Sequence, residues 1–270
     1  LLIRALLIHN AKYPANNSMS MTDKVTQMGF GAPSSVQEML YNSEDEITLI
    51  LRDTLEKGSF IEMFDFPFPE SLVDKDGNFV GQIIVTLVTK SLLDDKQAGE
   101  YCQSNIDILF GTYETETDRD TSKKGIKNPK GLEEPQNILL ESLYSARVKG
   151  AHPFTGFERE CTLVKYGKKF HPVKKYAIDL SEMTTSNRQR YLRGDRKWYL
   201  KIEGLYRDFI EQDARARNYQ LSQEYCLLLT IRDPNGKAPV YDEVAQQLDY
   251  KNFLHHNIQL RNVVTIDGTL

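Results

Sequence analysis

Few residues of this chain have side chains suited to catalysis or metal binding, and their spacing in the sequence matches no known catalytic or metal-binding motif. There are five histidines: His9 lies in an apolar run, His152 and His171 each precede a proline, and His255 and His256 are adjacent. Neighbouring residues of a strand point to opposite faces, so the adjacent pair is poorly placed to share a metal ion. The residue before a proline favours extended backbone, which places His152 and His171 in loops or turns. We interpret His9 as a hydrogen-bonded core residue and assign no catalytic or metal-ligating histidine.

The acidic and glycine-containing segments do not match the motifs that bind calcium or phosphate. The acidic groups Glu44-Asp-Glu46, Asp94-Asp95 and residues 118–120 lack the D-x-[DN]-x-[DN]-G spacing of a calcium loop, so we expect solvated loops there. No phosphate loop, G-x-G-x-x-G or G-x-S-x-G segment occurs, and Gly29-x-Gly31 lacks the third glycine and a preceding strand. The sequence therefore predicts no cofactor and no metal.

The three cysteines, Cys102, Cys161 and Cys226, are widely spaced and form no C-x-x-C pair. Neither a zinc site nor a disulfide framework is indicated, and buried free thiols in a reducing compartment are the simplest interpretation. We therefore expect a cytoplasmic location.

Neither the net charge nor the hydropathy favours nucleic acid or a membrane as a partner. The formal net charge is -4, so nothing favours nucleic acid as a partner. The lysine-rich residues 165–175 could bind an anion, but a strand pair with lysines on its solvated outer face is the preferred interpretation. No apolar run approaches the roughly 20 residues that cross a bilayer.

Periodicity predicts four helices along the chain. Residues 1–13 form an apolar helix that Pro14 should stop, and the glycines of Met28-Gly-Phe-Gly-Ala-Pro-Ser34 suit a tight turn. Ser34 or Ser35 should cap a short helix at residues 36–41. Further helices are predicted at residues 135–148, which are amphipathic, and at residues 239–248.

Between these helices the chain is rich in strand-forming runs. We predict strands at residues 46–52, 59–66, 79–90, 106–113, 162–166, 175–180, 197–210, 224–231 and 257–266. The turn Asp233-Pro-Asn-Gly236 follows one of them, and the charged residues 114–134 form an excursion. Trp198, Tyr199, Tyr206 and Phe209 are interpreted as core residues of an antiparallel β-sandwich of jelly-roll type rather than as a ligand platform.

Two stretches carry a family resemblance. Ile3-Arg-Ala-Leu-Leu-Ile-His-Asn-Ala11, followed by Gly29-Phe-Gly-Ala-Pro33, is similar to the R-A-L-L-x-H-S-A helix and G-Y-G-x-P turn of subtilisin-like serine proteases. Asn10 stands in place of the usual serine and Phe30 in place of the usual tyrosine. Residues 64–72, residues 81–90 and the stretch 225–244 are similar to the β-rich extension of a bacterial subtilase subgroup.

The resemblance implies a protease from which the catalytic residues of this chain are missing. Subtilases use a Ser–His–Asp triad and an oxyanion-hole asparagine, with the serine in a G-T-S-x-x-x-P segment before the helix that opens this sequence. No such segment occurs in this sequence. The nearest candidate, Thr184-Thr-Ser186-Asn187, lacks the glycine and the proline and is expected in a polar loop. The triad residues would precede Leu1, so we assign no catalytic residue to this chain.

These observations predict two units in a mainly β chain with some α. Residues 1–42 would be the terminal helices of a subtilisin-type α/β domain, and residues 43–270 a β-sandwich accessory domain with the excursion at 114–134. The implied partners are the upstream catalytic domain, onto which the first helix would dock, a protein substrate and, by family analogy, an AAA-type ATPase. The alternatives are an independent β-sandwich that binds carbohydrate or protein, and an unrelated all-β protein.

Overall fold

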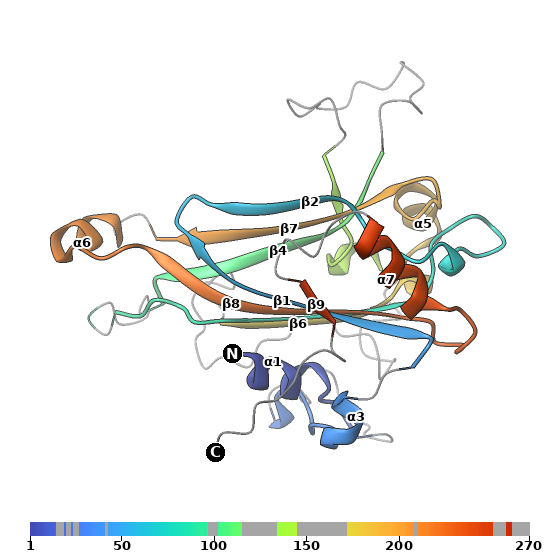
Figure 1. The fold of residues 1–270 in the computed structure, drawn as a ribbon, viewed down its shortest axis with the longest axis horizontal. Helices are drawn as coiled ribbons and strands as arrows, with labels where there is room; N and C mark the ends of the chain where they lie inside the picture. Colours follow the sequence, from blue (N-terminus) through green and yellow to red (C-terminus); the bar gives the residue numbers. More distant parts are fainter. Residues whose placement is uncertain are drawn as a thin grey trace.

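The computed structural model describes residues 1–14, 19, 23, 27–40, 43–94, 96, 102–114, 134–144, 172–207, 210–250 and 258–260. These residues form two antiparallel β-sheets with short helices beneath them and at their ends (Figure 1). The expected mainly β fold with some α is therefore confirmed. Within this part of the chain, no helix is both long enough and apolar enough to cross a membrane.

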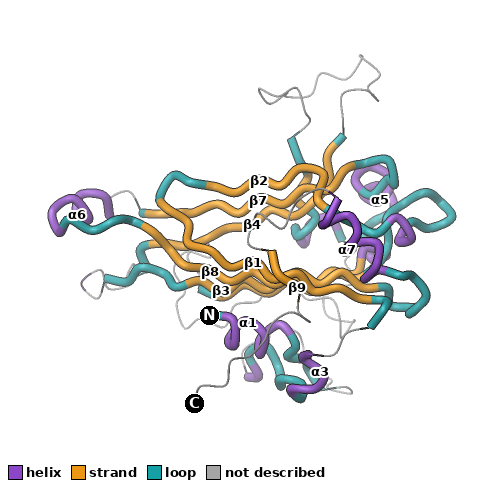
Figure 2. The backbone as a smooth tube through the Cα atoms, viewed as in Figure 1, coloured by secondary structure: helices purple, strands orange, loops and turns teal. Residues whose placement is uncertain are grey.

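The two sheets lie one above the other as separate layers (Figure 2). The five-stranded sheet has the order β6 (Val173–Asp179), β3 (Gln82–Thr89), β8 (Ser222–Arg232), β1 (Glu46–Glu56) and β9 (Ile258–Leu260). The four-stranded sheet has the order β2 (Phe60–Phe66), β7 (Lys197–Tyr206), β4 (Ser104–Tyr113) and β5 (Gln136–Asn137). Each pairing of these strands is antiparallel.

The main hydrophobic core fills the space between the sheets. Every second residue of a strand faces this space, as Leu49 and Leu51 do in β1 and Ile106, Ile108 and Phe110 do in β4. Trp198 lies in the middle and stacks on Phe68, with ring centroids 4.0 Å apart. Because both layers contribute, the core joins strands that are far apart in sequence.

The five-stranded sheet is buried on its other face as well. Ile50, Val88 and Leu228 point away from the main core and form a second cluster with α1 (Leu2–His9). Figure 1 shows α1 beneath this sheet, on the face away from the four-stranded sheet, with α3 (Val36–Leu40) nearby. Two buried faces explain why β1, β3 and β8 contain continuous apolar runs in place of strict alternation.

Short helices lie at the two ends of the layers. At one end, α7 (Val240–Tyr250) adds Val240, Val244 and Leu248 to the main core, and α5 (Thr185–Tyr191) precedes β7. At the other end, α6 (Ile210–Arg217) connects β7 to β8. Single 3₁₀ turns occupy Glu70–Leu72, Glu141–Leu143 and Leu180–Glu182.

Most predicted elements appear, with shifted ends. Seven of the predicted strands correspond to β1, β2, β3, β4, β6, β7 and β8, and residues 258–260 of the last predicted strand form β9. The Asp233–Gly236 turn is closed by a hydrogen bond from Gly236 N to Asp233 O, and the Asp233 carboxylate accepts hydrogen bonds from three further backbone N–H groups. The Ser35 hydroxyl caps α3 by accepting a hydrogen bond from Glu38 N. The strand predicted at 162–166 lies outside the described residues, as does the interior of the charged excursion.

Three predictions of local structure were wrong. Residues 135–144 form β5, a turn and a 3₁₀ turn where an amphipathic helix was predicted, because Ile138 and Leu139 enter the main core as part of an extended chain and Ile138 N bonds to Phe110 O. The predicted strand 197–210 ends at Tyr206, and α6 begins at Ile210. The expected polar loop around residues 184–187 is instead the start of α5.

Candidate functional site

The two halves of the family-like motif form one compact unit. We call residues 1–14 together with residues 29–34 the helix–turn unit. Lys12 and Ala32 exchange two backbone hydrogen bonds, from Lys12 N to Ala32 O at 2.9 Å and from Ala32 N to Lys12 O at 3.0 Å. The Tyr13 hydroxyl donates to Gly29 O at 2.6 Å, and the Ser34 hydroxyl donates to Asn10 O at 3.0 Å. The turn is therefore folded back onto the end of the helix.

Gly31 permits this close approach. Its φ angle is +95°, and an added Cβ would lie 2.4 Å from Lys12 O. A residue with a side chain would be strained at this φ and would also push the two backbones apart. The backbone geometry of the turn therefore requires a glycine at position 31. The tight turn expected there is confirmed by the hydrogen bond from Gly31 N to Met28 O.

The helix–turn unit packs on the outer face of the five-stranded sheet. Ala5 and Leu6 are buried, and Phe30 covers the same cluster from the turn. On the sheet side the contacts come from Ile50, Val88, Val173, Cys226 and Leu228. The helix ends at His9, with Asn10 as its C-cap, and so stops five residues before Pro14, the predicted stop.

His9 connects the helix to three strands through hydroxyl groups. Its Nδ1 lies 2.9 Å from Thr86 Oγ1 in β3, and its Nε2 lies 2.8 Å from Thr230 Oγ1 in β8. Thr230 is itself 2.6 Å from Thr48 Oγ1 in β1. His9 is 4% exposed, so the interpretation of His9 as a hydrogen-bonded core histidine is confirmed.

Lys175 caps the end of the helix from β6. Its Nζ donates to Ile8 O at 2.8 Å, an oxygen that also accepts a hydrogen bond from Ala11 N, and to Ala11 O at 2.7 Å, just beyond the end of the helix. Burial, and secondarily the charge of Lys12, lowers the pKa of Lys175 to about 8. A cation at a helix C-terminus interacts favourably with the aligned peptide dipoles. The lowered pKa shows that burial nevertheless costs the charged ammonium of Lys175 more than these contacts return.

The opposite side of the helix faces outward and is apolar too. Ile3 is 66% exposed and Leu7 is 43% exposed, and these residues are four apart on one helical face. Leu1 adds a third exposed side chain, at 39%. The helix thus has one apolar face against the sheet, and its solvent face carries these three apolar side chains together with the exposed Arg4.

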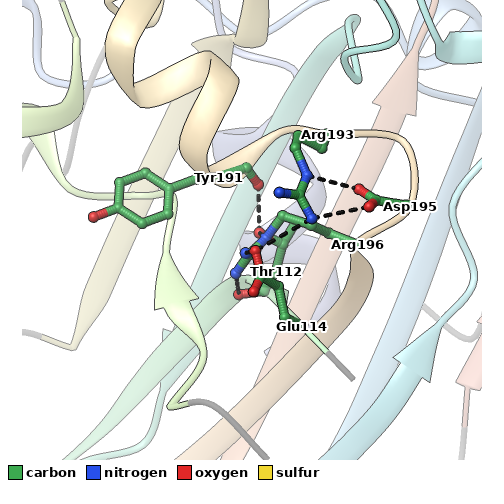
Figure 3. A network of polar contacts seen from close by, with 6 residues as sticks. All are labelled: Thr112, Glu114, Tyr191, Arg193, Asp195 and Arg196. Atoms are coloured by element: carbon green, nitrogen blue, oxygen red, sulfur yellow. Dashed lines mark hydrogen bonds and ion pairs between the residues drawn. The ribbon is translucent and has the colours of Figure 1, made fainter. Parts of the chain in front are cut away.

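A network of charged side chains, of which Arg196 is buried, holds the point where the chain leaves β4 (Figure 3). Arg196, 2% exposed, donates to Thr112 Oγ1 at 2.9 Å and to Glu114 Oε1 at 2.8 Å. Arg193 lies 3.3 Å from the same Glu114 oxygen and forms two hydrogen bonds of 2.9 Å with Asp195. The hydrogen bond from Arg193 is the largest cause of a lowered pKa of Asp195. The Thr112 hydroxyl donates to Tyr191 O, which attaches the end of α5.

The remaining candidates from the sequence are scattered. Trp198 and Tyr199 are each 2% exposed, so neither offers an exposed ring. Trp198 lies in the main core, but Tyr199 faces the other side of the four-stranded sheet and contacts Phe64 and Tyr113. Cys102 and Cys226 are buried free thiols as predicted. Within the described residues, no group of three His, Cys, Asp or Glu side chains is placed to hold a metal ion. Residues 118–120, 152, 161, 209, 255 and 256 lie outside this part of the chain, as does Asp95.

The interpretation of the lysine-rich stretch was wrong where the structure describes it. Lys174 is 2% exposed and pairs with Asp107 Oδ1 at 2.8 Å, and Lys175 caps α1, so neither lysine belongs to a solvated face. Residues 165–171 are not described. Sequence reasoning also missed Thr86 and Thr230, whose only signal is a threonine at the centre of an otherwise apolar strand run.

Comparison with known proteins adds no assignment to this geometry. No protein-family model matches the chain. No curated protein matches it either.

Proposed function

We propose that this chain is the C-terminal region of a subtilisin-like serine endopeptidase, without catalytic residues of its own. In this proposal residues 1–42 complete the protease domain, and residues 43–270 form a β-sandwich accessory domain that braces it. The motif resemblance of residues 3–11 and 29–33 suggests the family, and the assignment to the protease depends on it.

The observation that supports the proposal best is the two-sided apolar character of α1. One face is buried on the five-stranded sheet through Ala5 and Leu6, while Ile3 and Leu7 are exposed on another. A helix that is apolar nearly all round is characteristic of a buried position between two bodies. The β-sandwich would be one body, and the catalytic domain would be the other.

Within the proposal the helix–turn unit is a shared element. The sequence alone suggested that the first helix docks on the catalytic domain. Here the helix is also attached to the accessory domain by the His9–Thr86–Thr230 contacts and by Lys175. The accessory domain would then support the helix that follows the catalytic serine segment, and so hold that segment in place.

The deciding experiment begins with the coding sequence upstream of Leu1. A G-T-S-x-x-x-P segment shortly before Leu1, with Asp and His motifs further upstream, is expected. The encoded protein should then hydrolyse a casein substrate and lose this activity with a serine-directed reagent or after substitution of the serine by alanine. Residues 1–270 alone should show no hydrolysis. An unrelated upstream sequence, or reagent-sensitive hydrolysis by residues 1–270 alone, contradicts the proposal.

A further inference from the structure

One edge of the four-stranded sheet is open. β2 is the terminal strand of this sheet, and among the described residues it pairs only with β7 (Figure 2). In this part of the chain, the backbone groups of Phe60–Met63 make no hydrogen bond apart from the pairing with β7. In an edge strand, every second residue directs its N–H and C=O groups away from the neighbouring strand. The first half of β2 therefore presents a row of unpaired backbone groups.

The other three sheet edges are less suited to pairing. β9 has three residues and β5 has two. β6 has seven residues, but these include Lys174 and Lys175, and lysine is a residue type that opposes pairing at sheet edges. β2 also has seven residues, Phe-Ile-Glu-Met-Phe-Asp-Phe, with no lysine, arginine or proline among them. β2 is thus the long edge that lacks the usual protection.

A bulge sets the length of this open edge. The register between β2 and β7 shifts between Phe64 and Phe66, where Asp65 has a φ angle of 53°. A bulge bends its strand and interrupts regular pairing. The Asp65 carboxylate also lies 3.5 Å from Lys197 Nζ, so its charge is already paired. A partner strand would therefore pair with Phe60–Phe64, which is about 17 Å of extended chain.

The side chains of the edge alternate between the main core and the outer face of the sheet. Met63 is buried in the main core and Ile61 packs against it. Three side chains therefore point to the outer face, those of Phe60, Glu62 and Phe64. Lys201 Nζ lies 5.2 Å from the ring centroid of Phe60, yet Phe60 is still 55% exposed. A neighbouring strand would meet a ring, a carboxylate and a second ring in succession.

The carboxylate at the middle of the edge carries an unbalanced charge. Glu62 Oε1 accepts a hydrogen bond of 2.6 Å from the Tyr199 hydroxyl. Burial, and secondarily this hydrogen bond, raises the pKa of Tyr199, so the donor is neutral and the charge of Glu62 remains. Lys201 lies opposite Glu62 on β7, but its ammonium pairs with Glu203 at 3.0 Å. Within the described ranges Glu62 forms no ion pair, so a cation on a partner strand would balance it.

The same carboxylate argues against a second copy of this chain as the partner. Two β2 strands paired antiparallel over Phe60–Phe64 would place Glu62 of one copy directly opposite Glu62 of the other. Like charges at such a cross-strand position are destabilising, whereas opposite charges are stabilising. The charge of the edge therefore distinguishes a basic partner strand from a second copy.

We propose that β2 pairs with an extended segment of a partner protein, antiparallel over Phe60–Phe64, in which a lysine or arginine lies opposite Glu62 and apolar residues lie opposite Phe60 and Phe64. Backbone hydrogen bonds supply the attachment, and the alternate side chains select the sequence. The inference does not depend on the proposed protease assignment, because it concerns only this edge and is tested on residues 1–270.

The test is a titration of isotope-labelled residues 1–270 with the peptide Ser-Val-Thr-Arg-Thr-Val-Ser, followed by the backbone amide shifts. With Arg opposite Glu62, the two valines lie opposite Phe60 and Phe64. The expected Kd is on the order of 1 mM, because the costs of association offset much of the gain from one short strand. The largest shifts should occur in β2 and β7. The same peptide with Glu in place of Arg should bind about fivefold or more weakly.

Matched variants test the role of the carboxylate. Glu62→Gln keeps an oxygen that can accept from Tyr199 and removes the charge, so it should weaken the Arg peptide about threefold. The Arg and Glu peptides should then bind within about twofold of each other. Glu224→Gln removes a carboxylate from β8, in the other sheet, and should leave both peptides unchanged.

Backbone methylation tests the pairing itself. Successive N–H groups of a strand point to opposite sides, so N-methylation at the Arg and at the following Thr gives two peptides of which one loses an N–H that faces β2. One of them should bind about tenfold more weakly and the other about as well as the parent peptide.

Several outcomes would each overturn the inference. They are shifts centred outside β2 and β7, equal binding of the Arg and Glu peptides, and equal effects of Glu62→Gln and Glu224→Gln. Equal effects of the two methyl groups, or no binding at about 10 mM peptide, would do the same. Sedimentation of residues 1–270 alone should give a monomer. A dimer would mean that a second copy takes the edge in place of the proposed basic segment.

Discussion

At Gly111 the four-stranded sheet leaves no room for a side chain. A Cβ added there would lie 1.7 Å from Gln136 O, because the backbone of β5, which pairs with β4 at Gly111 and Thr112, approaches this residue very closely. Gly194 lies in the turn before β7, and the nearest atom to its added Cβ is 3.3 Å away, on the side chain of Val73. A side chain at Gly111 would therefore clash with backbone atoms, whereas a side chain at Gly194 would only make a close contact with another side chain.

Gly111→Ala should lower the free energy of unfolding by about 3 kcal/mol, because β4 and β5 must separate to admit the methyl group. Gly194→Ala should cost less than about 1 kcal/mol, since a side chain can give way there. Urea unfolding followed by circular dichroism measures both. Equal stabilities of the Gly111 variant and the parent chain would show that the backbone of β5 does not approach Gly111 as closely as described.

The buried ammonium of Lys175 should make stability depend on pH in an unusual direction. Its pKa in the folded chain is about 8, below the usual value of 10.5, so between these values the folded state has lost a proton that the unfolded state keeps. The unfolded state binds more protons in this window, so stability contributed by this group rises with pH.

Lys175→Met provides the comparison, because the other titrating groups are common to both chains and cancel. The free energy of unfolding of the parent chain, relative to that of Lys175→Met, should increase by about 2–3 kcal/mol between pH 7 and pH 10. Chemical denaturation at a series of pH values measures this difference. A difference that stays constant or decreases would mean that Lys175 is not held in the buried position between Ile8 and Ala11.

Among the elements, the helix–turn unit should be separable from the sheets beneath it. Gly31→Ala combines an unfavourable φ with a clash at Lys12 O, so we expect the turn to detach and α1 to lose its attachment. Hydrogen exchange of the α1 amides should accelerate at least tenfold, while β3 and β8 amides, held by their sheet partners, should change little. Gly58→Ala is the control, because its φ is +79° with open space around the added Cβ. If both variants release the helix, or neither does, the close approach at Lys12 is not what holds the turn.

The end of β4 depends on two arginines that differ in burial. Arg196→Met leaves the Glu114 carboxylate without its buried partner, and breaking such a pair costs about 3 kcal/mol. Arg193 is 43% exposed, so Arg193→Met should cost less than about 1 kcal/mol. Thermal unfolding of both variants distinguishes them. A larger loss for Arg193→Met than for Arg196→Met would contradict the ranking by burial.

At the scale of the whole molecule, a glutamate should have very different effects on stability on the two faces of α1. Ile3→Glu changes an exposed position and should alter the free energy of unfolding of this chain by less than about 0.5 kcal/mol. Leu6→Glu places a carboxylate against Ile50 and Leu228 and should cost about 3 kcal/mol or release the helix. If the proposed protease is correct, Ile3→Glu should still reduce the activity or yield of the complete enzyme. An equal loss of stability for both variants of residues 1–270 would show that Ile3 is covered within this chain.

The sequence by itself determined the elements that depend on local chemistry. Apolar runs separated by turn residues located most of the strands, and Asp233-Pro-Asn-Gly236 located a turn because its side chains and glycine satisfy the turn locally. It also identified His9 as a core residue and located the Gly29–Pro33 turn. Residues 135–144 were misassigned because Ile138, Leu139 and Leu143 satisfy helical spacing equally well, and only their packing on β4 and the main core selects extended chain.

Tertiary structure alone decided what each surface touches. His9 bonds Thr230, which lies 221 residues away, and Lys175 reaches the end of α1 across a similar separation, so no local pattern indicates either contact. The same holds for the buried Lys174 and the partly buried Lys175, both of which we expected on a solvated face. It holds as well for Tyr199, which is buried on the outer side of its sheet. These choices depend on which sheet face a distant segment covers, and the energy of burial is set by that assembled contact rather than by neighbours along the chain.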